Sequence, residues 1–567
     1  MALTAEIAKS ANVLVWMVAL TTISITPWLS YDPINLVKLT VAFTGSCYAY
    51  FLIRLSSLDL QMQNHKKAIT AIKASLTAIL IGSCLTLFFS NAPFWQQFWG
   101  AYGRNTGFLY MLSLVIIIYS SLLLASNLEL KMKIMSVFHI TVIIQIFFGI
   151  LQIMGIDPSG WSTSEVFGTL GNTNFFSSFL GLAAIFFIYH SVSKTFKTFF
   201  YNTLMLLVSL WLIHESGSIQ GFFVFGVGFA VLGAVIVLPR YKLFYTVLTS
   251  FIFLACSSVV ALGTLGLGPL GKFIFQETMS FRLEYWRAGL RMFMENPIFG
   301  VGLSTFGDFY RKFRSQENVI EYGPDRFTNS AHNVVIDLAA NSGTLVSLGY
   351  LSLLVITFVL SIKNIFMSSS SDNYFALLFS MWLAFNVQSF ISIGQLGLSV
   401  WGWLFTGCLL GSLVGKSNMK EEDNQGKRGN QRVPVNYGNS NLQVSAKNHV
   451  LSLFGFLIAL CLSLPPLIAD ARFRSALEGG DVMRLRTSAT SFGASSWHAA
   501  LALNGSLQRA DEDSSRFLVD FMLGKNANDY YALRTNLVLK STSETERRSV
   551  FQRLKFLDPW NPDIQLP

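Results

Sequence analysis

The chain has 567 residues, of which 52% are apolar and only 13% carry a charged side chain. With a mean hydropathy of +0.49, this composition excludes an ordinary soluble protein and predicts an all-α, polytopic membrane protein. The net charge of +10 does not indicate a nucleic-acid partner, because the basic residues are distributed according to the side of the membrane.

Apolar runs long enough to cross a bilayer core, which takes about 20 residues, recur along the chain. The run at 199–213 is short for a span, but it fits the alternation of sides. We therefore predict thirteen transmembrane helices, near residues 11–29, 35–53, 74–90, 106–125, 134–154, 173–190, 199–213, 221–238, 243–267, 334–361, 374–392, 396–415 and 449–468.

Basic residues gather in every second connection between these runs, which places the N-terminus in the cytoplasm. The short outer loops carry a single basic residue, Arg104. The inner segments carry Lys9, Arg54, Lys66, Lys67, Lys73, Lys131, Lys133, Lys194, Lys197, Arg240, Lys242, Lys363 and six residues of the segment 416–448. The loop 268–332 and the tail 469–567 are therefore expected outside a multi-pass cytoplasmic (inner) membrane.

The predicted organisation has four parts. Residues 1–415 form a membrane core of twelve spans that includes the outer loop 268–332, the place where a catalytic site is expected because catalytic groups need water and a substrate route. Residues 416–448, rich in Asn, Gly and charge, are expected to be a disordered cytoplasmic linker. A thirteenth span at 449–468 leads to an extracytoplasmic helical tail, 469–567. All five cysteines fall inside predicted spans, which excludes a disulfide framework for the outer parts.

The tail repeats weakly at an interval of thirty-three residues, through "SSWHAAL", "NDYYALR" and "NPDIQLP". This period and its helix-turn-helix texture indicate tetratricopeptide-like hairpins. The alternative is an irregular helical domain, and in either case the tail is expected to contact a partner or a glycan.

The outer loop opens on an amphipathic helix with a cation in an unusual place. At 100° per residue, Trp286, Gly289, Leu290 and Phe293 share an apolar stripe, which is predicted to lie against the membrane core. Arg282 falls on the same side. It is either a functional cation at headgroup depth or an arginine whose stem covers apolar surface while its guanidinium reaches water.

His332 lies where the outer loop meets the tenth span. Its imidazole has an unperturbed pKa of about 6.5, so it can accept a proton from an attacking hydroxyl near neutral pH. The alternative is structural: residues 330–333 cap the start of the span, with His332 in its first turn.

Four sequence segments resemble the O-antigen ligase and polymerase superfamily. The first is Phe281–Gly302, where an arginine, three residues and a tryptophan precede "NPIFGVG"; the second is "AHN" at 331–333, followed ten residues later by Gly343. The others are "GAYGRNTGFLY" (Gly100–Tyr110) and "FGTLGNTNFFSSFLG" (Phe167–Gly181). Members with a tetratricopeptide-like tail form one branch of this family.

The resemblance implies a membrane glycosyltransferase that transfers a glycan from a polyprenyl-pyrophosphate carrier to an acceptor hydroxyl at the outer membrane face, with inversion and without a metal or other cofactor. His332 would activate the acceptor and Arg282 would hold the pyrophosphate, which an arginine fork binds in two-pronged fashion. Besides membrane lipid, the expected partners are the lipid-linked donor and a glycan, lipid A core or protein acceptor. The sequence does not distinguish a ligase from a polymerase.

One position departs from the family pattern. Members carry a second arginine in a turn that here reads "SGSIQGFF", with Gln220 near the arginine's place. Glutamine can donate a hydrogen bond to phosphate but brings no charge. We considered Arg287, Arg326 and Arg104 as replacements, and Arg287 is more typical of a residue paired with Glu284. The remaining substrate-binding candidates are Asn333, Asn172 and Asn174, of which the last two could equally cap a helix.

Two rival functions explain parts of the sequence. A transporter or flippase of lipid-linked sugars would also have many spans, but no internal repeat of hydropathy is evident. A membrane-anchored scaffold would leave the large outer loop without a role. The glycosyltransferase is therefore the favoured hypothesis.

Overall fold

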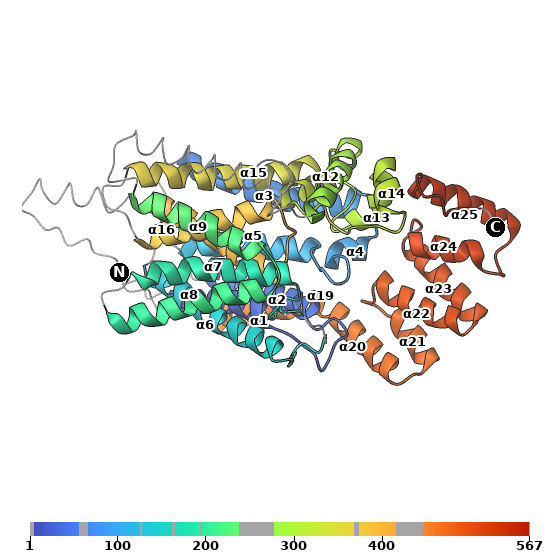
Figure 1. The fold of residues 1–567 in the computed structure, drawn as a ribbon, viewed down its shortest axis with the longest axis horizontal. Coiled ribbons are helices and arrows are strands. Elements are labelled where there is room, and N and C mark those ends of the chain that lie inside the picture. Colours follow the sequence, from blue (N-terminus) through green and yellow to red (C-terminus); the bar gives the residue numbers. More distant parts are fainter. Residues whose placement is uncertain are drawn as a thin grey trace, which may run out of the picture.

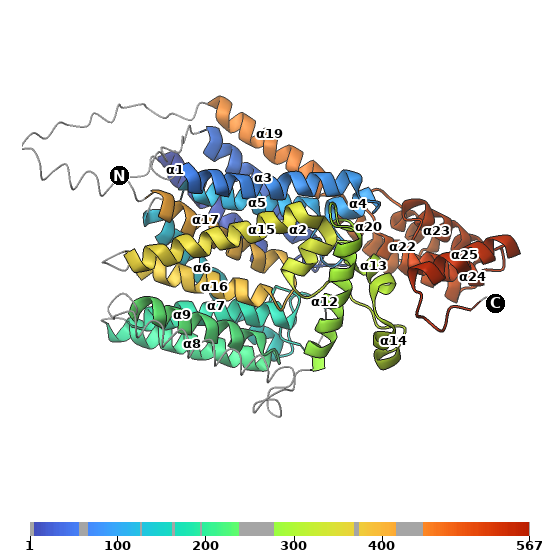
Figure 2. The same ribbon diagram turned by 90° about the horizontal axis from the view of Figure 1, so that it is seen from above.

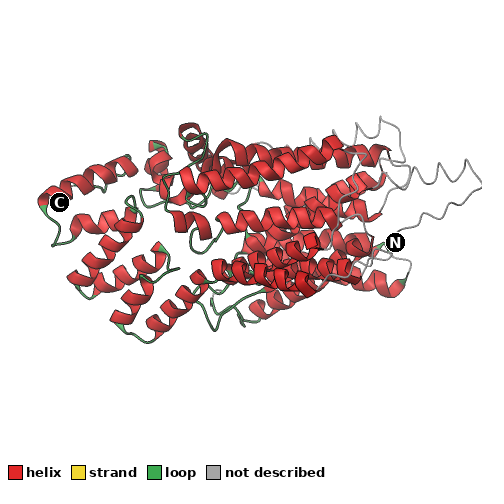
Figure 3. Cartoon of the chain, turned by 180° about the vertical axis from the view of Figure 1, so that it is seen from behind, coloured by secondary structure: helices red, strands yellow, loops and turns green. Residues whose placement is uncertain are grey.

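A computed structural model describes residues 5–55, 66–124, 128–161, 165–192, 195–237, 277–367, 373–415 and 446–565. Within these ranges every regular element is a helix (Figure 3), which confirms the predicted fold class. The predicted span at 243–267, which contains Cys256, and residues 416–445 of the linker lie outside the described residues. The other four cysteines are free.

The apolar helices form an elongated bundle (Figures 1 and 2). The loop helices and the tail lie at one end, here called the loop end, and the N-terminus lies at the other. The helices of the bundle are α1 (Ala5–Ile23), α2 (Asn35–Leu55), α3 (Lys66–Phe89), α5 (Phe108–Leu124), α6 (Leu128–Ile153), α7 (Thr173–Ser191), α8 (Phe196–Glu215), α9 (Gln220–Val237), α15 (Val334–Met367), α16 (Asn373–Ser389), α17 (Leu396–Gly415) and α19 (Ala446–Ser463).

Twelve of the thirteen predicted runs lie on these helices, and the remaining one is the run at 243–267. By length and hydropathy, seven described helices could cross a membrane, or eight if the bent pair α19 and α20 counts as one. Three further apolar helices are shorter. The run at 199–213 belongs to a helix of 20 residues, α8. A polytopic membrane protein is thus confirmed, and the number thirteen stays a prediction.

Small residues let the helices of the bundle approach closely. A Cβ added to Gly82 of α3 would lie 2.7 Å from Val346 of α15, and one added to Gly349 of α15 would lie 2.9 Å from the Ser75 carbonyl oxygen. This close packing holds α15 along α3, and α15 is the helix that follows His332.

A separate hydrophobic cluster, here called the loop core, lies at the loop end (Figure 2). It is built mainly from α12 (Glu277–Glu295), α13 (Phe306–Phe313) and the start of α15. The short helices α4 (Phe94–Trp99) and α14 (Gln316–Tyr322) also lie at this end. Buried residues of α12 in the loop core are Phe281, Tyr285, Ala288 and Met292.

The predicted orientation of α12 needs a correction. Gly289 does pack closely, with Ile336 and Phe306 around its Cα. Leu290, however, is 46% exposed, and the buried stripe runs instead through Phe281, Tyr285 and Met292. The helix packs on α13 and on the start of α15. These loop-core contacts decide which face of α12 is buried.

The tail contains six helices in succession, each in contact with the next (Figure 1). They are α20 (Pro465–Glu478), α21 (Val482–Ala489), α22 (Ser496–Gln508), α23 (Glu512–Lys525), α24 (Tyr530–Val538) and α25 (Glu544–Leu557). The last span was predicted to end at 468, but α19 ends at Ser463. Pro465 and Pro466 begin α20, where proline is favoured because the first helical residues have no intrahelical N–H partner.

Two buried carboxylates attach the tail to the rest of the chain. Asp470 accepts hydrogen bonds from the Asp32 backbone N–H (3.0 Å) and the Tyr102 hydroxyl (2.6 Å), which belong to two loops of the bundle. Asp558 accepts two hydrogen bonds from the Arg314 guanidinium (2.7 and 2.9 Å), and both side chains are fully buried. Arg314 also donates to the Arg326 carbonyl (3.0 Å), so the tail contact reaches the segment that leads to His332.

Candidate functional site

The segment "NPIFGVG" at 296–302 is joined to a break in α15 at Gly343. Gly343 has φ of 73°, and a Cβ there would lie 2.2 Å from the Ile298 carbonyl oxygen. Only glycine fits a position that is both left-handed and this close to another backbone. Backbone hydrogen bonds close the junction: Val301 to Ala340 (2.9 Å), Gly302 to Asn341 (3.0 Å) and Thr344 to Pro297 (2.8 Å).

The first two bonds satisfy carbonyl groups of α15, and the third satisfies the Thr344 N–H, all of which a broken helix would otherwise leave without partners. Residues 334–342 therefore form a short helical piece fixed to the loop core, and residues after the break continue as the long apolar helix. The two motifs that are far apart in the sequence thus act together to hold the start of α15, and with it His332.

A second tight loop carries Arg104. In "GAYGRNTG", a Cβ on Gly100 would lie 2.4 Å from the Thr106 nitrogen, and one on Gly107 would lie 2.4 Å from the Gly100 nitrogen. The two glycines therefore close the loop between α4 and α5 on itself. Arg104 extends from it and donates two hydrogen bonds to Asn329, at its carbonyl and side-chain oxygens (both 3.0 Å).

Asp337, in the first turn of α15, organises the approach to His332. Its carboxylate accepts hydrogen bonds from the Ala331 backbone N–H (2.9 Å) and the Ser330 hydroxyl (3.1 Å). It also lies 4.0 Å from the Arg104 guanidinium. One carboxylate thereby fixes the loop before His332 relative to Arg104.

His332 is not in the first turn of the helix. Asn333 is the capping residue, and its side-chain oxygen accepts from the N–H groups of Val335 (3.0 Å) and Ile336 (3.2 Å). His332 itself has φ of 52°, a left-handed conformation that only a few per cent of residues other than glycine adopt, histidine among them. The structural alternative therefore applies to Asn333, whereas His332 is held in a strained conformation that capping does not require.

The structure brings His332, Arg282 and Arg104 together. Burial, followed by the positive charges of Arg282 and then Arg104, lowers the pKa of the His332 imidazole to about 3. The ring lies 5.7 Å from that of Tyr285, a residue of the loop core. At neutral pH the imidazole is neutral and able to accept a proton, and the charges of two arginines that act on it suit an anionic ligand.

A cavity of about 50 Å³ lies beside Arg104, and its lining also includes Ser304, Asn329, Asp337 and residues of α5 and α15. We call it the arginine cavity. Buried Nε of Arg104 has no hydrogen-bond partner among the described residues. A buried donor of this kind calls for an explanation, and an oxygen of a bound anion would provide one.

The other loop arginines are engaged elsewhere. Arg326 lies with its guanidinium carbon 3.7 Å from the centroid of the Phe281 ring, at the edge of the loop core. Arg287 forms an ion pair with Glu284, and its side chain is 65% exposed. The expected pairing of Arg287 is confirmed, and Arg104 is the replacement candidate whose charge acts on His332.

Three candidates lie apart from this group, at the loop end of α7 and α9. Asn172 caps α7 by accepting from the Asn174 N–H (2.8 Å), and Asn174 accepts from the Ser218 hydroxyl (2.7 Å). Gln220 is buried and accepts a hydrogen bond from the Gln388 side chain (3.2 Å). The contacts described for these residues are with neighbouring helices and turns and do not connect them to His332.

Sequence reasoning missed Asp337 and Asn329. A signal for Asp337 was present, because an acidic residue at the start of an apolar span is uncommon and often functional. Asn329 gave no such signal, since its role depends on a loop more than two hundred residues earlier in the chain.

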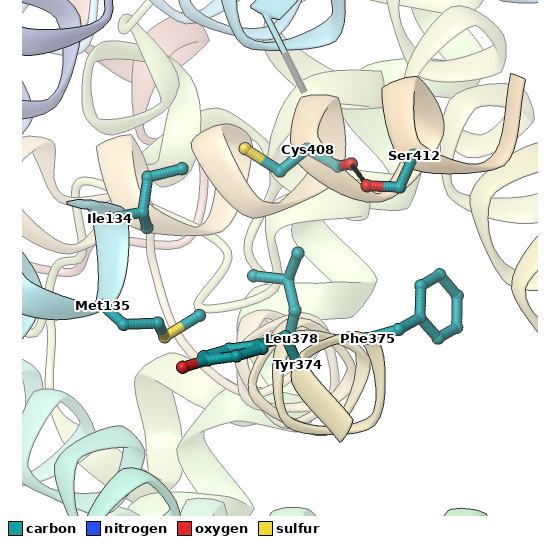
Figure 4. Close-up of a pocket in the computed structure, with 7 residues that line it drawn as sticks. All are labelled: Ile134, Met135, Tyr374, Phe375, Leu378, Cys408 and Ser412. Atoms are coloured by element: carbon teal, nitrogen blue, oxygen red, sulfur yellow. Dashed lines mark hydrogen bonds between the residues drawn. The ribbon is translucent and has the colours of Figure 1, made fainter. Parts of the chain in front are cut away.

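A further gap lies inside the membrane bundle, between α6, α16 and α17 (Figure 4). Its volume is about 10 Å³ and its lining is mostly apolar, with the Ser412 hydroxyl donating to the Cys408 carbonyl (2.7 Å). A water molecule needs at least about 10–15 Å³ and several polar partners, so the gap is a packing defect.

Residues 203–351 match the family model described as O-antigen ligase. The matched region covers about a quarter of the chain and includes Arg282, His332 and the Gly343 break, whereas Arg104 lies before it. No curated protein matches the chain. The family match confirms the resemblance found in the sequence and supports placing the chain in the O-antigen ligase and polymerase superfamily.

Proposed function

Because residues 203–351 match the O-antigen ligase family, we propose that this chain is a membrane glycosyltransferase acting at its loop end. Its donor is a glycan linked to a polyprenyl pyrophosphate, and its acceptor is a hydroxyl of a glycan, a lipid A core or a protein. The loop end faces the outside of the cytoplasmic membrane. The observation that carries the proposal is the Asp337 carboxylate, which accepts hydrogen bonds from the loop before His332 and lies 4.0 Å from the Arg104 guanidinium, so that a histidine and an arginine are held at one site.

In the proposed reaction, the acceptor oxygen attacks the anomeric carbon of the donor sugar from the face opposite the pyrophosphate. The bond from that carbon to the pyrophosphate oxygen breaks, and its electron pair leaves with the pyrophosphate. His332 takes the hydroxyl proton, and the configuration at the anomeric carbon inverts.

The two arginines stabilise the charge that develops on the leaving group. Positive groups held in place before the reaction stabilise a transition-state anion without rearranging, and their effect is large where water is excluded. Arg104 is held by Asn329 and Asp337. These cations supply the role that a metal has in other transferases, and we propose that transfer is independent of metal.

Binding of the anionic donor also changes the basicity of His332. A pyrophosphate beside Arg282 and Arg104 offsets their charges, and therefore raises the pKa of His332 from its value in the empty site. The imidazole thus becomes a stronger base when the donor is bound, which couples proton transfer to donor binding.

The test uses the purified full chain, a polyprenyl-pyrophosphate glycan and candidate acceptors, with a chelator present. We expect His332→Asn to lower transfer by about 10²–10⁴-fold, the range of general-base catalysis, because asparagine tolerates the left-handed backbone but cannot take the proton. His332→Ala should behave alike.

His214→Ala is the matched control, since the imidazole of His214 is 77% exposed at the end of α8. Transfer at the normal rate by both His332 variants would refute the role of His332. Movement of lipid-linked sugar across vesicles without any acceptor would favour a transporter instead.

A further inference from the structure

A large cleft separates the tail from the loop end of the membrane bundle. Its volume is about 650 Å³, and its walls come from α4, the loop 100–105, α13 and the tail helices α22 to α24. Ligand pockets typically measure about 300–1,000 Å³. The arginine cavity, at about 50 Å³, is far too small for the rest of a glycan substrate.

Aromatic rings form part of the cleft wall. Trp95 stacks on Trp99 with ring centroids 4.7 Å apart, and Tyr102 stacks on Trp497 at 4.6 Å. Trp95 is nevertheless 46% exposed and Trp497 36% exposed. Rigid aromatic faces that remain open to a cavity suit the apolar C–H faces of sugar rings, whose hydroxyl groups point outward from the ring edge.

The polar groups that face the cleft suit hydroxyl donors. Asp308 accepts a hydrogen bond from Gln96 (2.7 Å) and remains exposed to the cavity. Asp529 lines the same cleft. Two carboxyl groups from opposite walls, on α13 and at the start of α24, therefore share the cleft.

The basic residues of the cleft are already occupied. Arg311 lies 3.7 Å from Asp558 and over the ring of Tyr530. Lys525 donates to the Ala494 carbonyl (3.2 Å). The cleft thus combines aromatic rings and carboxyl groups with basic residues that already have partners in the protein, which favours an uncharged, hydroxyl-rich molecule over an anion.

The cleft adjoins the arginine cavity. Ser304 and Asn329 line both spaces. Asn329 accepts from Arg104, and Ser304 accepts from the Ala101 backbone N–H (3.0 Å). A chain of sugars lying in the cleft would therefore have one end beside the group formed by His332, Arg282 and Arg104.

We propose that this cleft binds an uncharged oligosaccharide, one of the two glycans that meet at His332, and we call it the glycan cleft. The inference rests on the proposed function for the identity of that reaction, but the binding itself is measured without it. The aromatic wall packs on the faces of the sugar rings, while Asp308 and Asp529 accept hydrogen bonds from sugar hydroxyls. The tail thereby supplies one wall of the substrate site.

The experiment is calorimetric titration of the full chain in detergent with two probes. One is the oligosaccharide released by mild acid from the lipid-linked glycans of the source cells, and the other is the oligosaccharide released from their surface acceptor glycans. We expect one of them to bind, and we expect Trp95→Ala and Asp308→Asn each to weaken binding at least about tenfold, the loss of one good contact.

Matched controls are Trp560→Ala and Asp513→Asn, outside the cleft. Trp560 is 44% exposed, close to the 46% of Trp95, and both controls should bind within twofold of the unchanged chain. Binding of only the lipid-derived probe would assign the cleft to the donor glycan, and binding of only the surface-derived probe would assign it to the acceptor.

The inference is overturned if neither oligosaccharide binds, or if both cleft variants bind as tightly as the controls. His332→Asn should leave oligosaccharide binding unchanged, because it removes only the base. Intact oligosaccharide binding by the unchanged chain, without any glycan transfer, would refute the proposed function while leaving the glycan cleft in place.

Discussion

The arginine cavity and the glycan cleft share a wall but differ in size, charge and construction. The arginine cavity is small, it holds the buried pair of Arg104 and Asp337, and it is lined by the loop before α5, by α5 and by the start of α15. The glycan cleft is about thirteen times larger by volume, from about 50 to about 650 Å³, and it is aromatic and acidic, with one wall from the tail. The difference teaches that glycan transfer, beside the arginine cavity, and glycan binding, in the glycan cleft, can be separated within one site. The two spaces depend on different tertiary contacts.

The largest effect is expected from breaking the buried ion pair between Arg314 and Asp558, which should remove the tail wall of the glycan cleft. Asp558→Leu leaves a fully buried guanidinium without its carboxylate, which typically costs about 3–5 kcal/mol. We expect a lower melting temperature, release of the tail to protease and loss of oligosaccharide binding. The double variant Arg314→Met with Asp558→Leu should recover most of the stability, since the fully buried guanidinium is then gone and only the partly exposed Arg311 loses a carboxylate neighbour. Equal destabilisation by the single and double variants would contradict this account.

Removing either arginine should affect the surroundings of His332 and leave the glycan cleft intact. Arg104→Ala and Arg282→Ala are each expected to lower kcat/KM for transfer about 10²-fold, the effect of losing one fixed donor to a developing anion. Inhibition by inorganic pyrophosphate should weaken in both, while oligosaccharide binding stays intact. Arg287→Ala, on the same helix as Arg282 but paired with Glu284 at the surface, is the control. A normal response to pyrophosphate in both variants would show that the leaving group binds elsewhere.

The pH dependence of glycan transfer should reveal the charges of the two arginines that act on His332. Its effect on the rate is expected to be smaller than that of the arginine substitutions. Burial and the two arginines lower the pKa of His332 to about 3, so the free enzyme keeps a neutral base well below pH 6.5. The acid limb of kcat/KM should therefore lie below that of kcat, which reports the donor complex. Rates measured over about pH 5 to 8 test this order, and Arg282→Ala should move the kcat/KM limb upward. An acid limb of kcat/KM near pH 6.5 in the unchanged chain would contradict it.

Much of the architecture follows from local sequence. Apolar runs predict the membrane helices because span length is fixed by the bilayer, and the quoted motifs point to the segments that surround His332. The glycines at positions 100 and 343 also predict tight backbone turns, since glycine marks left-handed or close-packed positions.

What the sequence could not predict depends on contacts between distant segments. The buried face of α12 was misplaced at Leu290 because hydrophobic periodicity does not reveal which surface the helix packs against. The proximity of Arg104 to His332 requires two closed loops, and the glycan cleft requires the tail to return to the loop end. Gln220, chosen by its place in a motif, instead contacts Gln388 in the bundle.

The break at Gly343 also has a consequence for how the protein responds to its bilayer. A straight helix of the 33 residues from Val334 to Phe366 would measure about 50 Å at 1.5 Å per residue, well beyond a hydrocarbon core of about 30 Å. Helices longer than the core adjust by tilting. Because residues 334–342 are bonded to "NPIFGVG" rather than continuing the helix, a change of tilt below the break is not transmitted rigidly to His332. The break at Gly343 therefore uncouples the position of His332 from the tilt of the long helix, so that His332 keeps its place when membrane thickness changes.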